Sequence, residues 1–210
     1  MRIALLGGTF DPIHLGHIQL ALAAKSQLAV DEVWLLPNAT PPHKPQPKAN
    51  VQQRLAMLSL VCKQWPELNV CDYELKQAGP NYTYLTLQGL HKLYPQHQWV
   101  FLMGMDSLVN LPLWRSWQEL LTLCHIGVYQ RPGWQLEAQT PVAAYYQTHL
   151  VTQDKIWQRA SGAFTPCIMP DMPISSSDIR AQLQANTPYD LVTGLPHCVQ
   201  DYIAAEHLYR

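Results

Sequence analysis

Short apolar runs bounded by turn residues recur along the chain, at 3–6, 33–36, 68–71, 99–103 and 126–129. Between them lie stretches with apolar residues at helical spacing, at 18–28, 51–63, 84–93 and 117–123. Alternation of buried strands with helices is typical of a parallel sheet covered on both faces, and right-handed crossovers make such a sheet doubly wound. The pattern therefore predicts an α/β protein with a doubly wound, mostly parallel sheet.

Two stretches interrupt this alternation. Residues 37–47 hold five prolines and residues 130–141 show no clear periodicity, so both are expected to be long loops. Residues 175–207 predict two helices separated near 187–196. No repeat or linker divides the 210 residues, of which 48% are hydrophobic. We therefore expect a single domain over residues 1–210 that ends in helices.

Charge is balanced, with 14 Lys and Arg against 15 Asp and Glu and a pI of about 6.7. Such a balance gives no general attraction for nucleic acid or a membrane, so any phosphate site is expected to be local. Five scattered cysteines, an odd number without close pairs, indicate a reduced, cytoplasmic setting. No apolar run is long enough for a signal peptide or a membrane span.

The first strand runs directly into Gly7 and Gly8, and a helix is expected to begin near residue 15. The glycines therefore lie where the carboxyl edge of a sheet meets a helix N-terminus, a place where α/β proteins bind phosphates. Glycine lets backbone N–H groups approach a ligand closely, and Thr9 adds a hydroxyl donor. A plain turn is the alternative, since the chain has neither a P-loop nor a dinucleotide-binding fingerprint.

His14 and His17 are three residues apart, so on a helix they share one face and can point at one anion. A half-built zinc site is the alternative, but two histidines without a third ligand nearby make an incomplete one. No resident metal is expected here.

The string GGTFDPIHLGH at 7–17 resembles the signature of the HxGH nucleotidyltransferases. This resemblance implies a Rossmann-like nucleotidyltransferase fold. It also implies that the two histidines stabilise charge as the α–β bridge of ATP breaks. The residues it assigns to ATP in this segment are Gly7, Gly8, Thr9, Phe10, His14 and His17.

A second motif, ISSSDIR at 174–180, places hydroxyl residues before an apolar helical pattern, as an N-capped helix should. A cation such as Arg180 is disfavoured in a first helical turn unless an anion is nearby, and Asp178 is one candidate for that anion. Taken alone, the residues leave capping and phosphate binding equally open. The segment resembles the ISST-like segment of the same superfamily, which implies ATP contacts from Ser176, Ser177, Ile179 and Arg180.

Four further segments resemble nicotinate-mononucleotide adenylyltransferases: PNATPPHKP at 37–45, GPNYTYLTL at 79–87, GMDS at 104–107 and PLWRSW at 112–117. With the two motifs they cover nearly the whole chain. Gly104 and Asp106 then belong to the ATP site, with Asp106 on ribose hydroxyls. The acceptor site that the resemblance implies draws on Asn38, His43, Lys44, Thr83, Asp106, Trp114, Trp117 and Arg131.

Each of these residues has a plain alternative. Lys44 can be a solvated lysine, Thr83 a helix cap and Asp106 an N-cap, and a tryptophan can simply pack in the core. Arg54, which matches a family arginine, is by itself expected at the surface, and Arg131 carries a similar caution. Two departures concern recognition of the pyridine ring: Asn81 stands where the family commonly has serine, and Arg115 where relatives can carry an aromatic residue.

The reaction that the resemblance implies transfers the adenylyl group of ATP to nicotinate mononucleotide, giving deamido-NAD and pyrophosphate. Because the acceptor phosphate is already anionic, this reaction needs no protein nucleophile or strong base. The sequence shows no residue grouping that would supply either one. Charge stabilisation is assigned to His14, His17, Lys44 and Arg180, with Mg²⁺ bridging phosphate oxygens. The alternatives are another acceptor (nicotinamide mononucleotide or phosphopantetheine), a regulatory nucleotide-binding module, and an interaction domain that uses the proline-rich loop.

Overall fold

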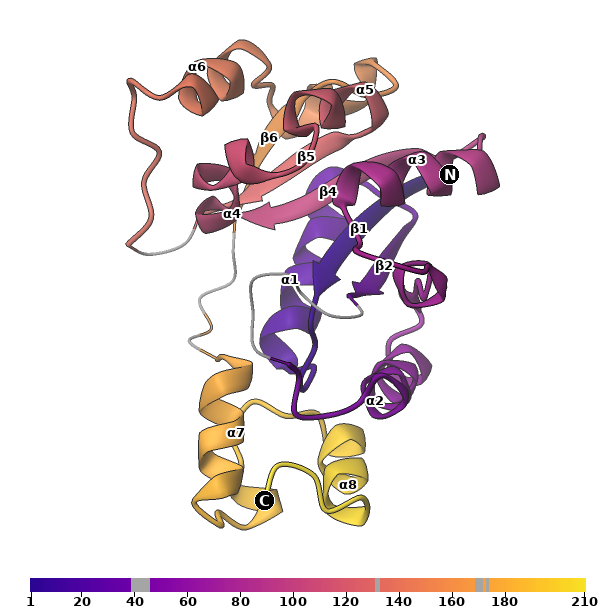
Figure 1. The fold of residues 1–210 in the computed structure, drawn as a ribbon, viewed down its shortest axis with the longest axis vertical. Coiled ribbons are helices and arrows are strands. Elements are labelled where there is room, and N and C mark those ends of the chain that lie inside the picture. Colours follow the sequence, from indigo (N-terminus) through magenta and orange to yellow (C-terminus); the bar gives the residue numbers. More distant parts are fainter. Residues whose placement is uncertain (39–45, 131–132, 169–171, 173) are drawn as a thin grey trace.

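The structure is a computed structural model of the chain, and it describes residues 1–38, 46–130, 133–168, 172 and 174–210. Its centre is a 6-stranded sheet in the order β3-β2-β1-β4-β5-β6, and every neighbouring pair is parallel (Figure 1). The strands are β1 Arg2–Gly8, β2 Glu32–Pro37, β3 Leu68–Val70, β4 Gln98–Gly104, β5 His125–Tyr129 and β6 Phe164–Cys167. The five predicted strands and the parallel sheet are confirmed.

Helices connect these strands. They are α1 Leu15–Leu28, α2 Val51–Gln64, α3 Thr83–Leu93, α4 Met105–Val109, α5 Leu120–Leu123, α6 Pro141–Thr148, α7 Ser176–Gln184 and α8 His197–Ala205. Short 3-10 turns are η1 Glu74–Lys76, η2 Leu111–Leu113, η3 Trp117–Glu119, η4 Gln153–Gln158 and η5 Tyr189–Leu191. The stretch expected to be one helix at 117–123 is η3 followed by α5, and the two helices expected after residue 175 are α7 and α8.

Successive side chains of the central strands enter opposite layers, as the two-residue period of a strand requires. On one face Ala4, Leu6, Val100 and Leu102 pack with the apolar sides of α1, α2, α7 and α8. On the other face Ile3, Leu5, Trp99 and Phe101 pack with those of α3, α4, α5 and α6. Both faces are therefore covered, as the doubly wound prediction requires.

Some elements escaped prediction. The strand β6 reads FTPC, four residues interrupted by a proline that gives no strand signal, and α4 is only five residues long. The described part of 130–140 contains no helix or strand, as expected for a loop, and α6 follows it. Of the predicted proline-rich loop, residues 39–45 lie outside the described residues. Within the described ranges no helix has the length and apolar character needed to cross a membrane.

Candidate active site

The ends of β1 and β4 meet at the middle of the sheet, where the strand order reverses. Leu6 pairs with Leu102, so Gly8 and Gly104, each two residues further along, leave the sheet at the same edge. Ligands of open α/β sheets bind outside the carboxyl ends of the strands at such a reversal point. The first motif and the Gly104–Asp106 segment are therefore brought to one place.

The loop after β1 is shaped by Phe10, whose backbone is left-handed with φ 50°. Its ring folds back beneath the loop and is 1% exposed. A Cβ atom at Gly8 would lie 2.9 Å from that ring, so only glycine fits there. The side chain of Phe10, a residue that the resemblance assigns to ATP, is consequently not accessible to a ligand.

The two motif histidines lie against each other at the start of α1. Their ring centroids are 3.8 Å apart, with His14 at the N-cap position and His17 in the first turn. A Cβ atom at Gly16 would lie 3.0 Å from His14 Nδ1, which explains the glycine of HxGH. His14 is only 5% exposed, and burial lowers its pKa to about 4, so the ring is neutral at pH 7. The two rings are therefore adjacent, although His14 precedes the helix rather than lying on one of its faces.

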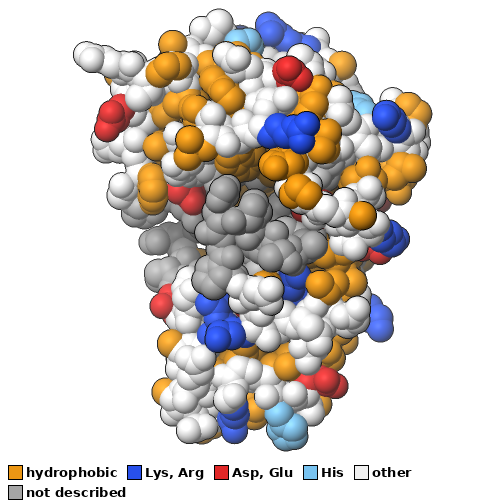
Figure 2. Space-filling model, viewed as in Figure 1, with side chains coloured by type: hydrophobic (Ala, Val, Ile, Leu, Met, Phe, Trp, Pro, Cys, Tyr) orange, Lys and Arg blue, Asp and Glu red, His pale blue; other side chains and the backbone are white. Residues whose placement is uncertain are grey.

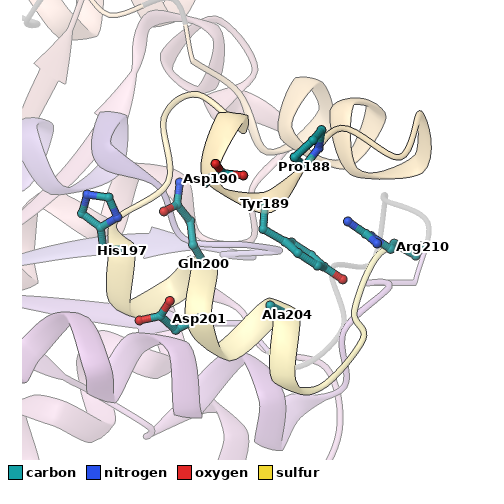
Figure 3. Close-up of a pocket in the computed structure, with 8 residues that line it drawn as sticks. All are labelled: Pro188, Tyr189, Asp190, His197, Gln200, Asp201, Ala204 and Arg210. Atoms are coloured by element: carbon teal, nitrogen blue, oxygen red, sulfur yellow. The ribbon is translucent and has the colours of Figure 1, made fainter.

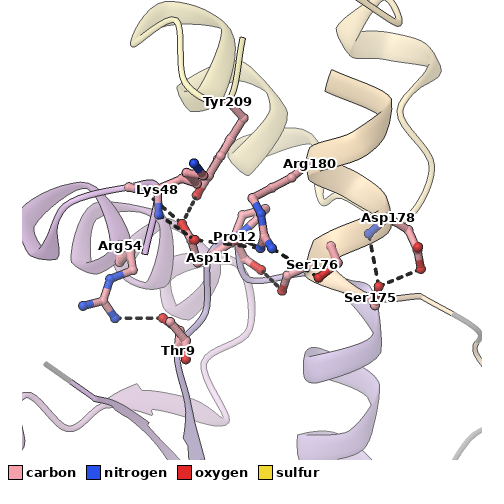
Figure 4. A network of polar contacts seen from close by, with 12 residues as sticks. Thr9, Asp11, Pro12, Lys48, Arg54, Ser175, Ser176, Asp178, Arg180 and Tyr209 are labelled. Atoms are coloured by element: carbon pink, nitrogen blue, oxygen red, sulfur yellow. Dashed lines mark hydrogen bonds and ion pairs between the residues drawn. The ribbon is translucent and has the colours of Figure 1, made fainter. Parts of the chain in front are cut away.

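The start of α7 lies beside the start of α1 (Figure 4). Ser176 Oγ donates to the carbonyl oxygen of Pro12 at 2.9 Å, and Arg180 Nη1 donates to the carbonyl oxygen of Asp11 at 2.6 Å. Ser177 Oγ accepts from Arg180 Nη2 at 3.2 Å. Two helix starts with phosphate-binding residue types thus converge, although they are far apart in sequence.

Arg180 has a different anion from the one suggested by its sequence neighbours. Its Nη1 lies 3.8 Å from Asp11 Oδ2, whereas Asp178 accepts from the capping hydroxyl of Ser175 at 2.6 Å. Asp178 therefore completes the helix cap, and Asp11 supplies the negative charge. Ile179 is fully buried beneath α7, so its side chain supports this helix start from within the core.

Arg54 was expected at the surface and is instead 1% exposed, which corrects that prediction. Its Nη1 donates to the carbonyl oxygens of Thr9 at 2.8 Å and Asn38 at 2.9 Å. Burial lowers the pKa of its guanidinium, with the charge of Asp11 acting in the opposite direction. Asn38 N also donates to the carbonyl oxygen of Gly8 at 3.1 Å. Asn38, a candidate for the acceptor site, thereby lies directly against the loop after β1.

Two segments from the other face of the sheet meet beside this edge. The guanidinium of Arg115 lies 5.1 Å from the ring centroid of Tyr82, which precedes Thr83. The ring of Trp114 lies edge-on to Phe101 at 6.1 Å, and Phe101 would be 3.5 Å from a Cβ atom at Gly7. The contact between Arg115 and Tyr82 thus joins the segments that carry Trp114 and Thr83. Phe101 lies between Trp114 and Gly7 of the first motif.

The structure rejects two plain alternatives. Thr83 is the first residue of α3, whose N-cap is Tyr82 with no side-chain cap, and Asp106 lies in the first turn of α4, whose N-cap is Gly104. Neither residue is a cap. Asn81, one of the departures, donates its amide to the carbonyl oxygen of Glu74 at 3.1 Å and so fixes the segment before α3.

Sequence comparison decides the family. Residues 5–182 match the Cytidylyltransferase-like family. A probable nicotinate-nucleotide adenylyltransferase of Shewanella woodyi is 43% identical over 211 residues, covering 100% of both chains. Its counterpart from Shewanella frigidimarina is 43% identical over 213 residues, again covering 100% of both chains. The chain belongs to the nicotinate-nucleotide adenylyltransferases.

Solved structures agree with the fold. A Plasmodium falciparum nicotinic acid mononucleotide adenylyltransferase complexed with NaAD superposes with a TM-score of 0.74 at 18% identity, covering 99% of this chain and 97% of that one. A putative nicotinate-nucleotide adenylyltransferase from Vibrio parahaemolyticus gives a TM-score of 0.66 at 18% identity, covering 100% and 95%. At this identity the likeness concerns the Rossmann-like nucleotidyltransferase fold, which is thereby confirmed.

The remaining candidates of this adenylyltransferase site fall into two groups. His43, Lys44 and Arg131 lie outside the described residues. Trp117 packs its ring edge-on against Tyr145 of α6 at 5.1 Å, while Trp114 faces the sheet edge through Phe101. Of the two tryptophans offered for ring stacking, the geometry favours Trp114.

A hollow of about 450 Å³ lies elsewhere, between η5 and α8 (Figure 3). None of the site candidates lines it. On the face drawn in Figure 2, lysine and arginine side chains are scattered singly rather than gathered in one patch. Neither feature competes with the sheet edge as the place of the reaction.

Proposed function

We propose that the chain binds ATP across the adjoining starts of α1 and α7 and binds nicotinate mononucleotide beside them. As a nicotinate-nucleotide adenylyltransferase, it transfers the adenylyl group of ATP to nicotinate mononucleotide, giving deamido-NAD and pyrophosphate in NAD biosynthesis. The observation that carries the proposed site is the pair of hydrogen bonds from Ser176 and Arg180 to residues 11–12, immediately before His14.

The donor side, as we define it, is the loop 7–14 with the starts of α1 and α7. Backbone N–H groups of the loop and the N-termini of two helices present partial positive charge to a triphosphate. His14, His17, Ser177 and Arg180 add side-chain donors, and Gly104 with Asp106 receives the adenosine ribose. Phe10 and Ile179 support this surface from beneath, because their side chains are buried.

The acceptor side, as we define it, comprises Asn38, Thr83, Asp106 and Trp114, together with His43, Lys44 and Arg131. The N-terminus of α3 at Thr83 offers backbone N–H groups to the nicotinate carboxylate, and Trp114 offers a ring face to the pyridine. Lys44 holds the mononucleotide phosphate. Direct contact between Asn38 and the backbone of Gly8 brings the two sides together.

The chemistry then reduces to positioning and charge stabilisation. A phosphate oxygen of the mononucleotide attacks the α-phosphorus of ATP in line, the α–β bridging bond breaks, and pyrophosphate leaves with the electron pair. His14, His17, Lys44 and Arg180 stabilise the negative charge as it moves to the bridging oxygen. Burial keeps His14 neutral, and an adjacent triphosphate is expected to raise the pKa of His14.

We propose Mg²⁺ as the metal that accompanies ATP. Among the residues that the structure describes, no three His, Cys, Asp or Glu side chains are grouped to hold a metal. Mg²⁺ usually keeps several water ligands and binds substrate phosphates, so an ion delivered with ATP needs no such group of protein ligands.

Pyrophosphate release tests the proposal. The purified protein is supplied with ATP and Mg²⁺ and, separately, with nicotinate mononucleotide, nicotinamide mononucleotide or phosphopantetheine. We expect nicotinate mononucleotide to give the largest kcat/KM. Preference for another acceptor would contradict the proposed acceptor side, and silence with all three despite ATP binding would contradict the proposed reaction.

A further inference from the structure

The carboxylate of Asp11 lies at a junction that the proposed reaction leaves unused. Asp11 is 6% exposed, and its two oxygens accept from three donors that come from distant parts of the chain (Figure 4). Oδ2 accepts from Lys48 N at 2.8 Å, and Oδ1 accepts from Ala49 N at 3.0 Å and from Tyr209 Oη at 2.9 Å. Hydrogen bonds to an ionised group are about twice as strong as neutral ones, so this junction is firm.

The backbone on either side of this carboxylate belongs to the donor side. The carbonyl oxygen of Asp11 accepts from Arg180, and that of Pro12 accepts from Ser176. Asp11 thus fixes the loop before His14 through its side chain, and its carbonyl oxygen accepts a hydrogen bond from Arg180 of α7.

The segment that Asp11 holds at Lys48–Ala49 leads into the acceptor side. The helix α2 begins two residues after Ala49, and its Arg54 binds the carbonyl oxygen of Asn38. A shift of the start of α2 would therefore also shift Arg54, whose hydrogen bond holds the backbone of Asn38. The carboxylate of Asp11 thus ties the donor loop to the start of α2, in addition to the contacts that Asn38 and Arg54 make with that loop.

Tyr209 is held in this junction against a local cost. Its backbone is left-handed with φ 67°, a conformation in which a bulky L-residue is an outlier and which costs about 1–3 kcal/mol. Its side chain is nevertheless 9% exposed and reaches Asp11 across 198 residues of sequence. The surroundings therefore impose this placement.

We propose that Asp11 is a positioning residue that sets the separation of donor and acceptor phosphates, and that Tyr209 is the anchor that holds its carboxylate in place. This inference rests on the proposed function. In-line attack requires reacting atoms about 3–3.5 Å apart, and a displacement of about 1 Å can lower the rate by about 10²-fold. Because neither side chain contacts a substrate in this scheme, substitution of either one lowers kcat and leaves both KM values nearly unchanged.

Tyr209→Phe is the first variant, because it removes one hydroxyl and keeps the buried ring. We expect kcat to fall about tenfold, with the KM for ATP and for nicotinate mononucleotide within about twofold of the wild type. The matched control is Tyr189→Phe, since no residue in the described ranges hydrogen-bonds to the buried Tyr189 hydroxyl. Its ring lies 3.9 Å from the guanidinium carbon of Arg210 (Figure 3), a contact that phenylalanine retains. The control is expected to keep the wild-type kcat.

A double-variant cycle tests whether Tyr209 acts through Asp11. Asp11→Asn keeps the shape but sets an N–H₂ group against the donors that the carboxylate accepts, and we expect a loss in kcat of about 10²-fold. If the anchor works through Asp11, adding Tyr209→Phe to this variant lowers kcat no further. Two independent, multiplying losses would overturn the coupling. If Asp11→Asn does not fold, the comparison of Tyr209→Phe with Tyr189→Phe still decides.

Thermal unfolding separates positioning from simple stability. A merely structural role lowers Tm for Tyr209→Phe and leaves kcat at 25 °C equal to that of Tyr189→Phe, and this result would overturn the inference. The wild-type enzyme reports on the proposed function separately. A wild-type enzyme that releases no pyrophosphate contradicts the proposed function itself. An active wild type together with an unchanged kcat for Tyr209→Phe contradicts only the role of Asp11 and Tyr209.

Discussion

Hydrogen bonds to the backbone hold the donor side, whereas ring contacts hold the part of the acceptor side around Thr83 and Trp114. Ser176 and Arg180 reach the loop before α1 across 164 and 169 residues of sequence, and both donate to carbonyl oxygens. On the acceptor side, Arg115 lies over the ring of Tyr82 and Trp114 lies edge-on to Phe101. Hydrogen bonds fix distance and direction, while ring contacts permit sliding. In the proposed function, the donor side therefore suits a constant group, a triphosphate, and the ring contacts would let the acceptor side select by shape.

The largest expected effect comes from the donor side. His17→Ala removes a charge-stabilising group, so turnover should fall by about 10²-fold or more with every acceptor. Steady-state rates of pyrophosphate release measure this loss, and Tm reports that the protein still folds. Near-normal turnover in the variant would remove His17 from the mechanism. It would also contradict the expectation that the largest effect comes from the donor side.

Acid pH gives the next effect. Burial lowers the pKa of His14 from 6.5 to about 4, so His14 contributes stability above pH 6.5 that is lost as the pH falls toward 4. Between about pH 7.5 and about pH 5 we expect a loss of about 2 kcal/mol from this residue. Burial lowers the pKa of His125 in the core to about 4 as well, and adds a similar loss.

His14→Gln should therefore reduce this loss in the free energy of unfolding by about 2 kcal/mol, measured with urea at the two pH values. Inorganic triphosphate, which the proposed site places beside His14 and not beside His125, should reduce the loss in the wild type more than in His14→Gln. For Glu74 of η1 the sign is opposite: burial raises the pKa of Glu74, so acidification through its titration favours the folded state. An unchanged pH slope in His14→Gln would contradict the assignment.

A third test concerns the acceptor side. Trp114→Ala should raise the KM for nicotinate mononucleotide about tenfold, because stacking of a ring on an aromatic side chain contributes about 1–3 kcal/mol. The KM for ATP should stay constant. Trp117→Ala is the control, since Trp117 packs on Tyr145 instead. If Trp117→Ala raised the KM for the mononucleotide more than Trp114→Ala, the choice between the two tryptophans would be reversed.

The sequence predicted the donor side more completely than the acceptor side, for a physical reason. GGTFDPIHLGH is one continuous strand, turn and helix, so its residues converge by local geometry alone. The importance of Asp11 within that motif was invisible, because its partners Lys48 and Tyr209 are 37 and 198 residues away and no periodicity links them. The prediction that Arg54 lies at the surface was wrong. Helical spacing cannot show that two backbone carbonyl oxygens accept hydrogen bonds from its buried guanidinium.

The acceptor side depended on resemblance because its residues come from separate elements joined by single contacts. Thr83 opens α3, Asp106 lies in the short helix α4, and Trp114 follows η2. Each residue alone fits a plain structural role. Only the folded chain shows that Thr83 and Asp106 are not caps and that Trp114 and Trp117 point to different neighbours.

The smallest expected effect tests whether ring contacts really tolerate change. Arg115→Ala removes the cation–π contact with Tyr82, which at an exposed site contributes about 0.5–1 kcal/mol. We expect the KM for nicotinate mononucleotide to rise about twofold to fivefold, with kcat and the KM for ATP unchanged. Arg115→Tyr restores an aromatic residue at this position and should recover most of the loss through ring packing on Tyr82. A large fall in kcat for Arg115→Ala would instead mean that the acceptor side is positioned as strictly as the donor side, because only displacement of the reacting phosphates lowers kcat in this way.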